Sequence, residues 1–426
     1  MLTLKIIREQ TDFVIERLRI KNFDASELAL QIIAVDNERK VLQTALDANL
    51  SQQNMRAKQI GILMQQGKRD EAEAAKQQTA QLKEQSKTLE QQLSDTEKQR
   101  DNLLVLLPNL PSEQVPAGRT PDDNVIIREG GKKPVLPQAL PHWELAAKYN
   151  LIDFELGVKL TGAGFPVYKD KGAKLQRALI TYFLDCNTAA GYTEVQPPLM
   201  VNETSGFGTG NLPDKEGQMY HVGIDNFYLI PTAEVPVTNI YRDVILNASE
   251  LPVKLTAYTP CFRREAGSYG KDVRGLNRLH QFDKVEIVQL QLPQNSYATL
   301  DEMVRHVENI VQSLELPYRI IKLCGGDMSF TSAMTFDFEV FSAAQERWLE
   351  VSSVSNFESF QANRLKLRYR DETKKTQLAH TLNGSSLALP RIVAALLENN
   401  QTPEGIRIPK ALQAYTGFEM IEEQER

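Results

Sequence analysis

Residues 256–288 read TAYTPCFRREAGSYGKDVRGLNRLHQFDKVEIV, and this stretch decides the fold. At both of its ends apolar residues alternate with polar ones, which predicts two antiparallel strands. Between them lies a glycine-rich segment carrying Lys271, Arg274 and Arg278, as expected for a long, mobile, basic loop. Loops of this length inside a compact domain are usually functional or disordered. The pattern predicts a hairpin whose charges serve a site, with a merely solvated surface hairpin as the alternative.

Length, charge and cysteine usage bound the class of protein. The chain has 426 residues, which predicts two or three domains. Its net charge is -6, so a contact with RNA must use local basic patches. The three cysteines form no CxxC pair, which disfavours a disulfide framework or a thiolate zinc site and indicates a reducing compartment. No signal peptide and no apolar run of about 20 residues is present, so we expect a soluble cytoplasmic protein without a membrane span.

Residues 26–107 contain almost no proline or glycine, and their apolar residues recur three and four positions apart, as in a coiled coil. Gly61 and the segment 67–70 interrupt the pattern, which predicts two helices of about 35 residues, each about 50 Å long, folded back on each other. Two uses remain open: a structural or dimerising coiled coil, or an arm that grips nucleic-acid phosphates. The second rests on the tip, which has no acid between positions 48 and 69. The basic residues there are Arg56, Lys58, Lys68 and Arg69.

Prolines are dense in residues 108–140, which we interpret as a linker. Residues 141–426 then alternate between helical and strand-like patterns. An amphipathic segment at 175–190 predicts a helix, followed by a glycine and a short strand around Pro198. A further helix is predicted at 300–314, with strands at 317–323, 335–340 and 348–356. The mixture indicates an α+β domain.

Four segments carry a resemblance to a known family. Residues 262–286, FRREAGSYGKDVRGLNRLHQFDKVE, resemble motif 2 of the class II aminoacyl-tRNA synthetases, in the form found in seryl-tRNA synthetases of bacterial type. The helix and strand around Pro198 resemble motif 1, and residues 380–401 resemble motif 3. The Thr-Ala-Glu tripeptide at 232–234 also fits the seryl form.

The resemblance implies a class II catalytic domain, built on an antiparallel sheet and preceded by a long antiparallel α-helical coiled-coil hairpin. It assigns residues 1–107 to an N-terminal tRNA-binding domain, with the hairpin arm at about 26–107. Residues 108–140 remain the linker, and residues 141–426 form the catalytic domain. Pro198 is expected at the interface of a homodimer.

The same resemblance implies an ATP site. Arg263 would bind the α-phosphate, and Arg391 would neutralise the β- and γ-phosphates, so these two are the expected catalytic residues. Planar guanidinium groups suit this task because they donate paired hydrogen bonds and stay charged. The expected ATP-binding set is Arg263, Arg264, Glu265, Phe282, Glu350, Val351, Ser352, Ser353 and Arg391. Within it, Phe282 would stack on adenine, and Glu350 with Ser353 would bind Mg²⁺.

The implied serine site consists of Thr232, Ala233, Glu234, Glu286, Asn383 and Ser385. Such a site needs acceptors for an ammonium group and a partner for a small hydroxyl. How Thr232, Glu234 and Glu286 divide these two tasks stays open, with Glu286 preferred for the hydroxyl and ammonium side. The motif 3 turn also departs from the family, because Ser386 and Pro390 stand where glycines are usual.

The implied function is the ATP-dependent activation of L-serine to seryl-adenylate, followed by transfer of the seryl group to the 3′ end of tRNA(Ser). ATP is a substrate and Mg²⁺ the cofactor, and selenocysteine tRNA stays open as a further partner. Two alternatives are a paralogue that loads a carrier other than tRNA and a non-catalytic RNA-binding or coiled-coil scaffold. The intact basic arm disfavours the first. The presence of all the charged motif residues disfavours the second.

Overall fold

The computed structural model describes residues 1–214, 216–265 and 274–423. The chain divides into two compact units. The first comprises Met1–Arg19 and Phe23–Pro108, and the second comprises Ile20–Asn22 and Asn109–Arg426. Lys271, and with it the predicted mobility of the loop tip, lies outside the described residues.

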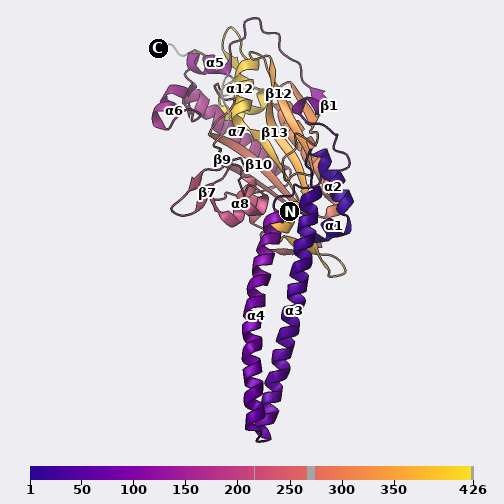
Figure 1. Ribbon diagram of the computed structural model, residues 1–426. Coiled ribbons are helices and arrows are strands. Elements are labelled where there is room, and N and C mark those ends of the chain that lie inside the picture. Colours follow the sequence, from indigo (N-terminus) through magenta and orange to yellow (C-terminus); the bar gives the residue numbers. More distant parts are fainter. Residues whose placement is uncertain (215, 266–273, 424–426) are drawn as a thin grey trace. The chain divides into compact units, whose positions relative to one another are not determined.

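The first unit is a helical hairpin with two short helices at its start. Its helices are α1 (Leu4–Glu9), α2 (Thr11–Ile20), α3 (Ser26–Gln65) and α4 (Arg69–Leu104). The long helices α3 and α4 pack side by side along their length (Figure 1). The predicted interruption at Gly61 is wrong, because α3 continues through it for 40 residues, or about 60 Å. Only Gly67, with φ of +74°, marks the turn between the helices.

A mixed seam joins the two long helices. Apolar residues such as Ile32, Leu46 and Leu93 are buried in it. At its middle, Ser86 Oγ donates to Asn49 Oδ1 at 2.9 Å and accepts from Gln53 Nε2 at 2.6 Å. A satisfied polar layer of this kind fixes the register of a coiled coil, because a shifted pairing would leave these groups buried without partners.

The second unit is built on an antiparallel sheet of eight strands in the order β1-β11-β12-β13-β16-β10-β9-β4, in which only β4 runs parallel to its neighbour. These strands are β1 (Val125–Gly130), β4 (Thr193–Glu194), β9 (Val253–Phe262), β10 (Gln281–Gln291), β11 (Tyr318–Lys322), β12 (Met334–Ser342), β13 (Arg347–Glu358) and β16 (His380–Ala388). The stretch predicted as a linker therefore supplies an edge strand, β1. Its six residues, VIIREG, do not alternate between apolar and polar, so no strand pattern marked them between the prolines.

Smaller sheets and nine helices complete the described part of this unit. The small sheets use β2 (Ile152–Asp153), β3 (Val167–Tyr168), β5 (Met200–Asn202), β6 (His221–Val222), β7 (Phe227–Leu229), β8 (Ile245–Asn247), β14 (Arg368–Arg370), β15 (Thr376–Leu378), β17 (Ile406–Arg407) and β18 (Met420–Ile421). The helices are α5 (His142–Lys148), α6 (Phe154–Leu160), α7 (Asp170–Ala189), α8 (Glu203–Thr209), α9 (Glu234–Asn239), α10 (Ser296–Ser313), α11 (Ser359–Leu365), α12 (Leu389–Asn399) and α13 (Lys410–Thr416).

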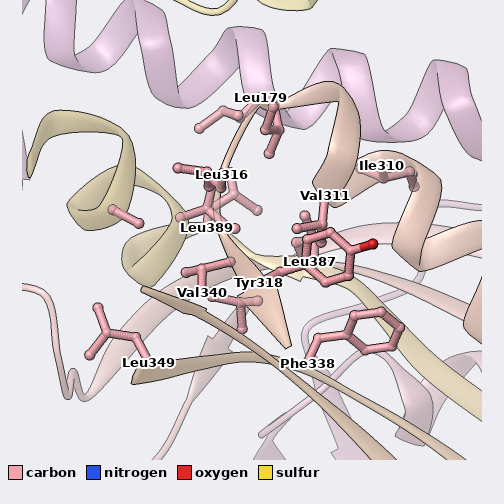
Figure 2. Close-up of a cluster of buried hydrophobic side chains, with 14 of the residues drawn as sticks. Leu179, Ile310, Val311, Leu316, Tyr318, Phe338, Val340, Leu349, Leu387 and Leu389 are labelled. Carbon is pink, nitrogen blue, oxygen red and sulfur yellow. The ribbon is translucent and has the colours of Figure 1, made fainter. Parts of the chain in front are cut away.

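The main core lies between the large sheet and the helices α7, α10 and α12. Figure 2 shows part of this core, with Phe338 and Val340 of β12 in the same cluster as Ile310 and Val311 of α10. Burial of such side chains contributes about 25 cal/mol per Å² of apolar surface. Because strand residues alternate in direction, the residues between the core-facing ones point to the opposite face of the sheet. That second face is where the polar motif residues gather.

Among the described residues, none of the helices combines the length and the hydropathy that a membrane crossing needs.

Candidate active site

Three adjacent strands, β10, β16 and β13, carry most of the predicted site residues. Glu286 of β10 lies opposite Ser385 of β16 in the ladder, while Lys284 lies opposite Ala388. One residue on β10 therefore faces two on β16, Ser386 and Leu387, which is a β-bulge. Leu387 takes the strain, with φ of +82° although it is not glycine. The bulge sits directly beside Ser385 and breaks the regular register next to it.

A buried ion pair forms the centre of the predicted serine site. Lys284 Nζ lies 2.7 Å from Glu286 Oε2, and both side chains are less than a tenth exposed. Thr232 Oγ1 donates to the same Glu286 oxygen at 3.1 Å. Thr232 Oγ1 also accepts the backbone N–H of Glu234 at 3.2 Å. The structure thus brings together Thr232 and Glu286, two residues of the predicted serine site, and adds Lys284.

Glu234 begins α9 and is the second carboxyl group of the site. Gln361 Nε2 donates to Glu234 Oε1 at 2.6 Å. Gln361 Oε1 accepts from Thr381 Oγ1 at 2.7 Å, which fixes the orientation of the amide. Burial, and then the negative charge of Glu286, raise the pKa of Glu234 to about 7. This carboxyl group is therefore poised between its acid and its carboxylate near neutral pH.

Three further predicted residues surround this pair. Ala233 is fully buried and packs with Val288 of β10. Asn383 is 7% exposed, and its Nδ2 has no hydrogen-bond partner among the described residues. The backbone carbonyl of Ser385 accepts from Ser352 Oγ at 2.6 Å, which ties β16 to β13. We call Thr232, Ala233, Glu234, Glu286, Asn383 and Ser385 the serine cluster.

Arg263 directly follows β9 and contacts the residue that precedes the serine cluster in the chain. Its Nε donates to the carbonyl of Pro231 at 3.3 Å, the residue before Thr232. Its guanidinium lies over the ring of Phe282, 5.1 Å from the centroid. The predicted phosphate-binding and adenine-stacking residues are thus neighbours, and Arg263 occupies a face of the Phe282 ring.

Arg264 and Glu265 follow at the start of the long loop. Arg264 is exposed, and its backbone N–H donates to the carbonyl of Gln218 at 2.8 Å. Glu265 pairs with Arg278 on the returning side of the loop, with Nη1 and Oε2 3.0 Å apart. The two sides of the loop are therefore joined by charge at its base.

Arg391 lies in the first turn of α12, where Pro390 fits without cost. Its Nη1 donates to the carbonyl of Glu350 at 2.7 Å, and its Nε donates to the carbonyl of Asn277 at 3.1 Å. Ser386, the other departure from the family, is fully buried and donates to Asn187 Oδ1 at 2.8 Å. The structure thus accommodates both Ser386 and Pro390, the first through a hydrogen bond and the second in the first turn of α12.

Glu350 and Ser353 lie close together on β13, with Ser353 Oγ donating to Glu350 Oε1 at 3.4 Å. Val351 and Ser352 between them are buried. Asp337 of β12 lies opposite Ser353, and its Oδ1 is buried without a partner among the described residues. Burial and the charge of Glu350 raise the pKa of Asp337 well above its usual range. This set of hard oxygen atoms fits Mg²⁺, which takes most other ligands from phosphate and water.

The structure places the remaining predicted residues at the surface of their units. Lys58, Lys68 and Arg69 are exposed near the turn of the helical hairpin, and Arg56 is half-buried. Pro198 is exposed next to Leu199 and Met200, whose side chains are also exposed.

Comparison with known proteins bears on the whole chain. Residues 1–111 match the family described as "Seryl-tRNA synthetase N-terminal domain", and residues 220–400 match "tRNA synthetase class II core domain (G, H, P, S and T)". A serine--tRNA ligase of Salinibacter ruber is 51% identical over 424 residues, covering 99% of both chains. The chain belongs to the seryl-tRNA synthetase family.

Solved structures agree with this seryl-tRNA synthetase assignment. The crystal structure of seryl-tRNA synthetase from Pyrococcus horikoshii complexed with ATP matches with a TM-score of 0.92 and 32% identity over 100% of both chains. That of the cytoplasmic serine-tRNA ligase from Naegleria fowleri in complex with AMP matches with a TM-score of 0.87 and 25% identity, over 100% of this chain and 99% of that one. The predicted family, fold class and ligase function are confirmed.

Sequence reasoning missed three residues of this seryl-tRNA synthetase site: Lys284, Gln361 and Asp337. Lys284 could have been found, since it lies two residues before Glu286 and therefore on the same strand face. Asp337 lies in the strand predicted at 335–340, but that prediction did not indicate its neighbour Glu350. Gln361 left no signal, because its partner Glu234 is 127 residues away.

Proposed function

We propose that this protein activates L-serine with ATP and esterifies the 3′ end of tRNA(Ser), using the residues described above. The observation that carries the assignment of roles is the serine cluster. In it, two carboxyl groups lie around Thr232, and the backbone directly before Thr232 holds Arg263. Groups for an amino acid and for a phosphate therefore meet at one point.

In the first step a carboxylate oxygen of serine attacks the α-phosphorus of ATP. The new P–O bond gives seryl-adenylate, and the bond to the β-phosphate breaks to release pyrophosphate. Arg263 and Arg391 neutralise the charge on the phosphates, and no protein nucleophile is required. Mg²⁺ held by Glu350 and Ser353 supplies further charge stabilisation when bound.

Recognition of serine rests on charge and on the cost of unpaired buried groups. Glu286 and Glu234 accept hydrogen bonds from the ammonium group of serine, and Thr232 orients Glu286 toward it. Asn383 Nδ2, which is buried without a partner among the described residues, supplies a donor. An amino acid without the hydroxyl would leave polar groups unpaired, which selects against alanine and glycine.

In the second step the terminal ribose hydroxyl of tRNA takes the seryl group and AMP leaves. We assign residues 1–107 to tRNA binding, with the arm at about 26–107, residues 108–140 to the linker, and residues 141–426 to catalysis. Arg56, Lys58, Lys68 and Arg69 contact tRNA phosphates near the arm's turn. Selenocysteine tRNA is a second acceptor, since it would be loaded by the same chemistry.

We further propose a cytoplasmic homodimer. The exposed apolar residues Leu199 and Met200 beside Pro198 support an interface there, because neighbouring exposed apolar side chains often mark contact sites. The three cysteines are free thiols, which supports a reducing compartment. Sedimentation of the wild type and of Met200→Glu tests the interface. The wild type should sediment as a dimer and the variant as a monomer. A wild type that sediments as a monomer would contradict the proposal.

Charging of tRNA(Ser) with labelled serine tests the acceptor. Wild-type protein should charge tRNA(Ser), and the double variant Lys58→Glu/Arg69→Glu should raise the KM for tRNA about tenfold or more. Lys98→Glu, an exposed charge change elsewhere on α4, is the matched control and should behave as the wild type. Serine activation without any tRNA charging would favour the carrier-loading paralogue.

A further inference from the structure

The segment that returns from the long loop to β10 is held partly by residues outside the three motifs. This return segment comprises Arg274, Gly275, Leu276 and Asn277. The Arg274 guanidinium lies over the ring of Trp143, 4.7 Å from its centroid. The N–H of Leu276 donates to His142 Nε2 at 2.8 Å. Two successive residues of α5 therefore contact the segment.

The donor at Leu276 determines the state of the His142 ring. A backbone N–H can only donate, so Nε2 accepts and the proton of the neutral ring sits on Nδ1. Nδ1 lies 2.7 Å from Glu398 Oε1 and donates to it. Both side chains are completely buried. His142 thus links the carboxylate of Glu398 to the backbone of Leu276 through two hydrogen bonds.

Glu398 is itself held on several sides. Its Oε1 also accepts the backbone N–H of His142 at 3.0 Å and Gln345 Nε2 at 3.0 Å. Its Oε2 accepts the hydroxyl of Ser342. Burial opposes the charge, but the hydrogen bonds from His142 and Ser342 outweigh it and keep the pKa of Glu398 below its usual value. A carboxylate fixed in this way is a rigid support.

The same support reaches Arg391. Asn277 Nδ2 donates to Gln345 Oε1 at 2.9 Å, and the carbonyl of Asn277 accepts from Arg391 Nε at 3.1 Å. Arg391 and Glu398 lie seven residues apart, about two turns, on the single helix α12. The helix therefore holds the return segment twice, through Glu398 and His142 at Leu276 and through Arg391 at Asn277.

Close packing leaves the segment little freedom. Gly275 has φ of +65°, and a Cβ there would lie 2.2 Å from His142 Nε2. Only glycine fits both the backbone conformation and the approach to the ring. Leu276 is 1% exposed and belongs to the main core. The return segment is thus a fixed surface against which the Arg391 guanidinium rests.

We propose that His142 is a positioning residue for adenylate formation: with Glu398 it fixes the backbone of Leu276 and Asn277, against which Arg391 is oriented. The inference rests on the role of Arg391 in the proposed function. His142, although remote from the phosphates, thereby sets the direction of the Arg391 guanidinium. A displacement of about 1 Å in such a group can cost 10²-fold in rate.

Two substitutions separate the acceptor of His142 from its donor. His142→Gln can keep an acceptor for the Leu276 N–H, whereas the shorter His142→Asn keeps a donor for Glu398 and loses that acceptor. Serine-dependent exchange of pyrophosphate into ATP should fall about 10–100-fold in kcat for His142→Asn, with a raised KM for ATP and an unchanged KM for serine. His142→Gln should stay within about fivefold of the wild type.

Rates are normalised to active sites by the burst of adenylate formed, so that misfolded protein does not count. Tyr182→Phe, which removes a hydroxyl bonded to Ser313 between α7 and α10, is the control for the loss of one part-buried hydrogen bond. It should lower only the melting temperature. Gly275→Ala is a second route to the same displacement, because a Cβ there would lie 2.2 Å from His142 Nε2 and force the segment and the ring apart.

Wild-type kinetics in both His142→Asn and Gly275→Ala would overturn the proposal. Equal impairment of the Gln and Asn variants, with no change in the KM for ATP, would also overturn it, since that is the result of a purely structural role. Arg391→Ala distinguishes the proposed role of Arg391 from the positioning role of His142. If that variant kept full activity, the proposed role of Arg391 would fail. If it lost activity while the His142 variants did not, only the positioning role would fail.

Discussion

The serine cluster and the phosphate-binding side of the site differ in burial and in what holds their charges. Thr232 and Glu286 are 5% and 2% exposed, and side chains bind them. The side chains of Arg391 and Glu350 are 29% and 51% exposed, and two backbone carbonyls hold the arginine at 3.8 Å from the Glu350 carboxylate. The first region is a set of buried polar groups that bind mostly one another, and the second is a set of charged groups still in contact with solvent.

This difference indicates how each substrate is recognised. A small amino acid offers few contacts, so discrimination must come from the cost of leaving buried groups unpaired. ATP offers many charged oxygens, so the protein needs only to direct its cations and can leave them hydrated until ATP arrives. Changes on the phosphate side should therefore affect rate most. Changes in the serine cluster should affect selectivity, stability and pH dependence.

The largest effect is expected for Arg263→Ala. Loss of a guanidinium aimed at the α-phosphate should lower serine-dependent pyrophosphate exchange about 10²–10³-fold or more. The fold should persist, because Arg263 is only half-buried and, among the described residues, its side chain makes one hydrogen bond, to the Pro231 carbonyl, and one contact with the Phe282 ring. Thermal unfolding checks the fold and the exchange assay checks the rate. Wild-type-like activation by this variant would contradict the assigned role.

Glu286→Gln should come next, with a loss of both activity and stability. It leaves Lys284 as a buried cation without its partner, which costs about 3 kcal/mol in the free energy of unfolding. The KM for serine should rise about tenfold or more while the KM for ATP changes little. Urea unfolding and exchange kinetics measure the two effects. A variant with unchanged stability would mean that Lys284 does not depend on Glu286.

The pH dependence of serine binding should reflect Glu234, whose pKa burial and Glu286 raise to about 7. Protonation below this value removes a partner of the ammonium group, so the KM for serine should rise up to about tenfold per pH unit below 7. The sign for stability follows from the raised pKa. The protonated form stabilises the fold at low pH, and this contribution is lost as pH rises from the unfolded value through about 7.

Glu234→Gln tests both statements. The variant should show a flat KM profile for serine between pH 6 and 8 and a higher melting temperature than the wild type above pH 7, but not at pH 4. A wild-type profile that is already flat would show that Glu234 does not titrate in this range.

The smallest effect is expected for Ser353→Ala, which removes the weak 3.4 Å bond to Glu350 and one candidate oxygen for Mg²⁺. The Mg²⁺ concentration for half-maximal exchange should rise by about fivefold or less, the value of one modest hydrogen bond. Titration of Mg²⁺ at saturating ATP measures it. An unchanged requirement would remove Ser353 from the proposed set.

Much of the architecture was predictable because it is encoded locally. The period of three and four in residues 26–107 gave the helical hairpin, and the alternation at both ends of residues 256–288 gave β9 and β10. The break at Gly61 was wrong, since a Cβ-free residue on an open helix surface costs only about 1 kcal/mol and packing between two long helices outweighs it.

The contacts of the site were less predictable because they join distant positions. The motifs gave Thr232 and Glu286 but not their direct hydrogen bond. Gln361 and His142 each act through a partner more than a hundred residues away. Such pairings depend on how strands and helices pack in three dimensions, and single residues of these types are common everywhere on protein surfaces.

The most direct test of the account is pyrophosphate exchange into ATP by wild-type protein with Mg²⁺, supplied in turn with serine, threonine, alanine and glycine. The account predicts exchange with serine, and rates at least about 10²-fold lower with the other three, because the serine cluster penalises a missing hydroxyl or an added methyl group. Exchange of similar rate with alanine or glycine, or no exchange with serine from folded protein, would contradict it.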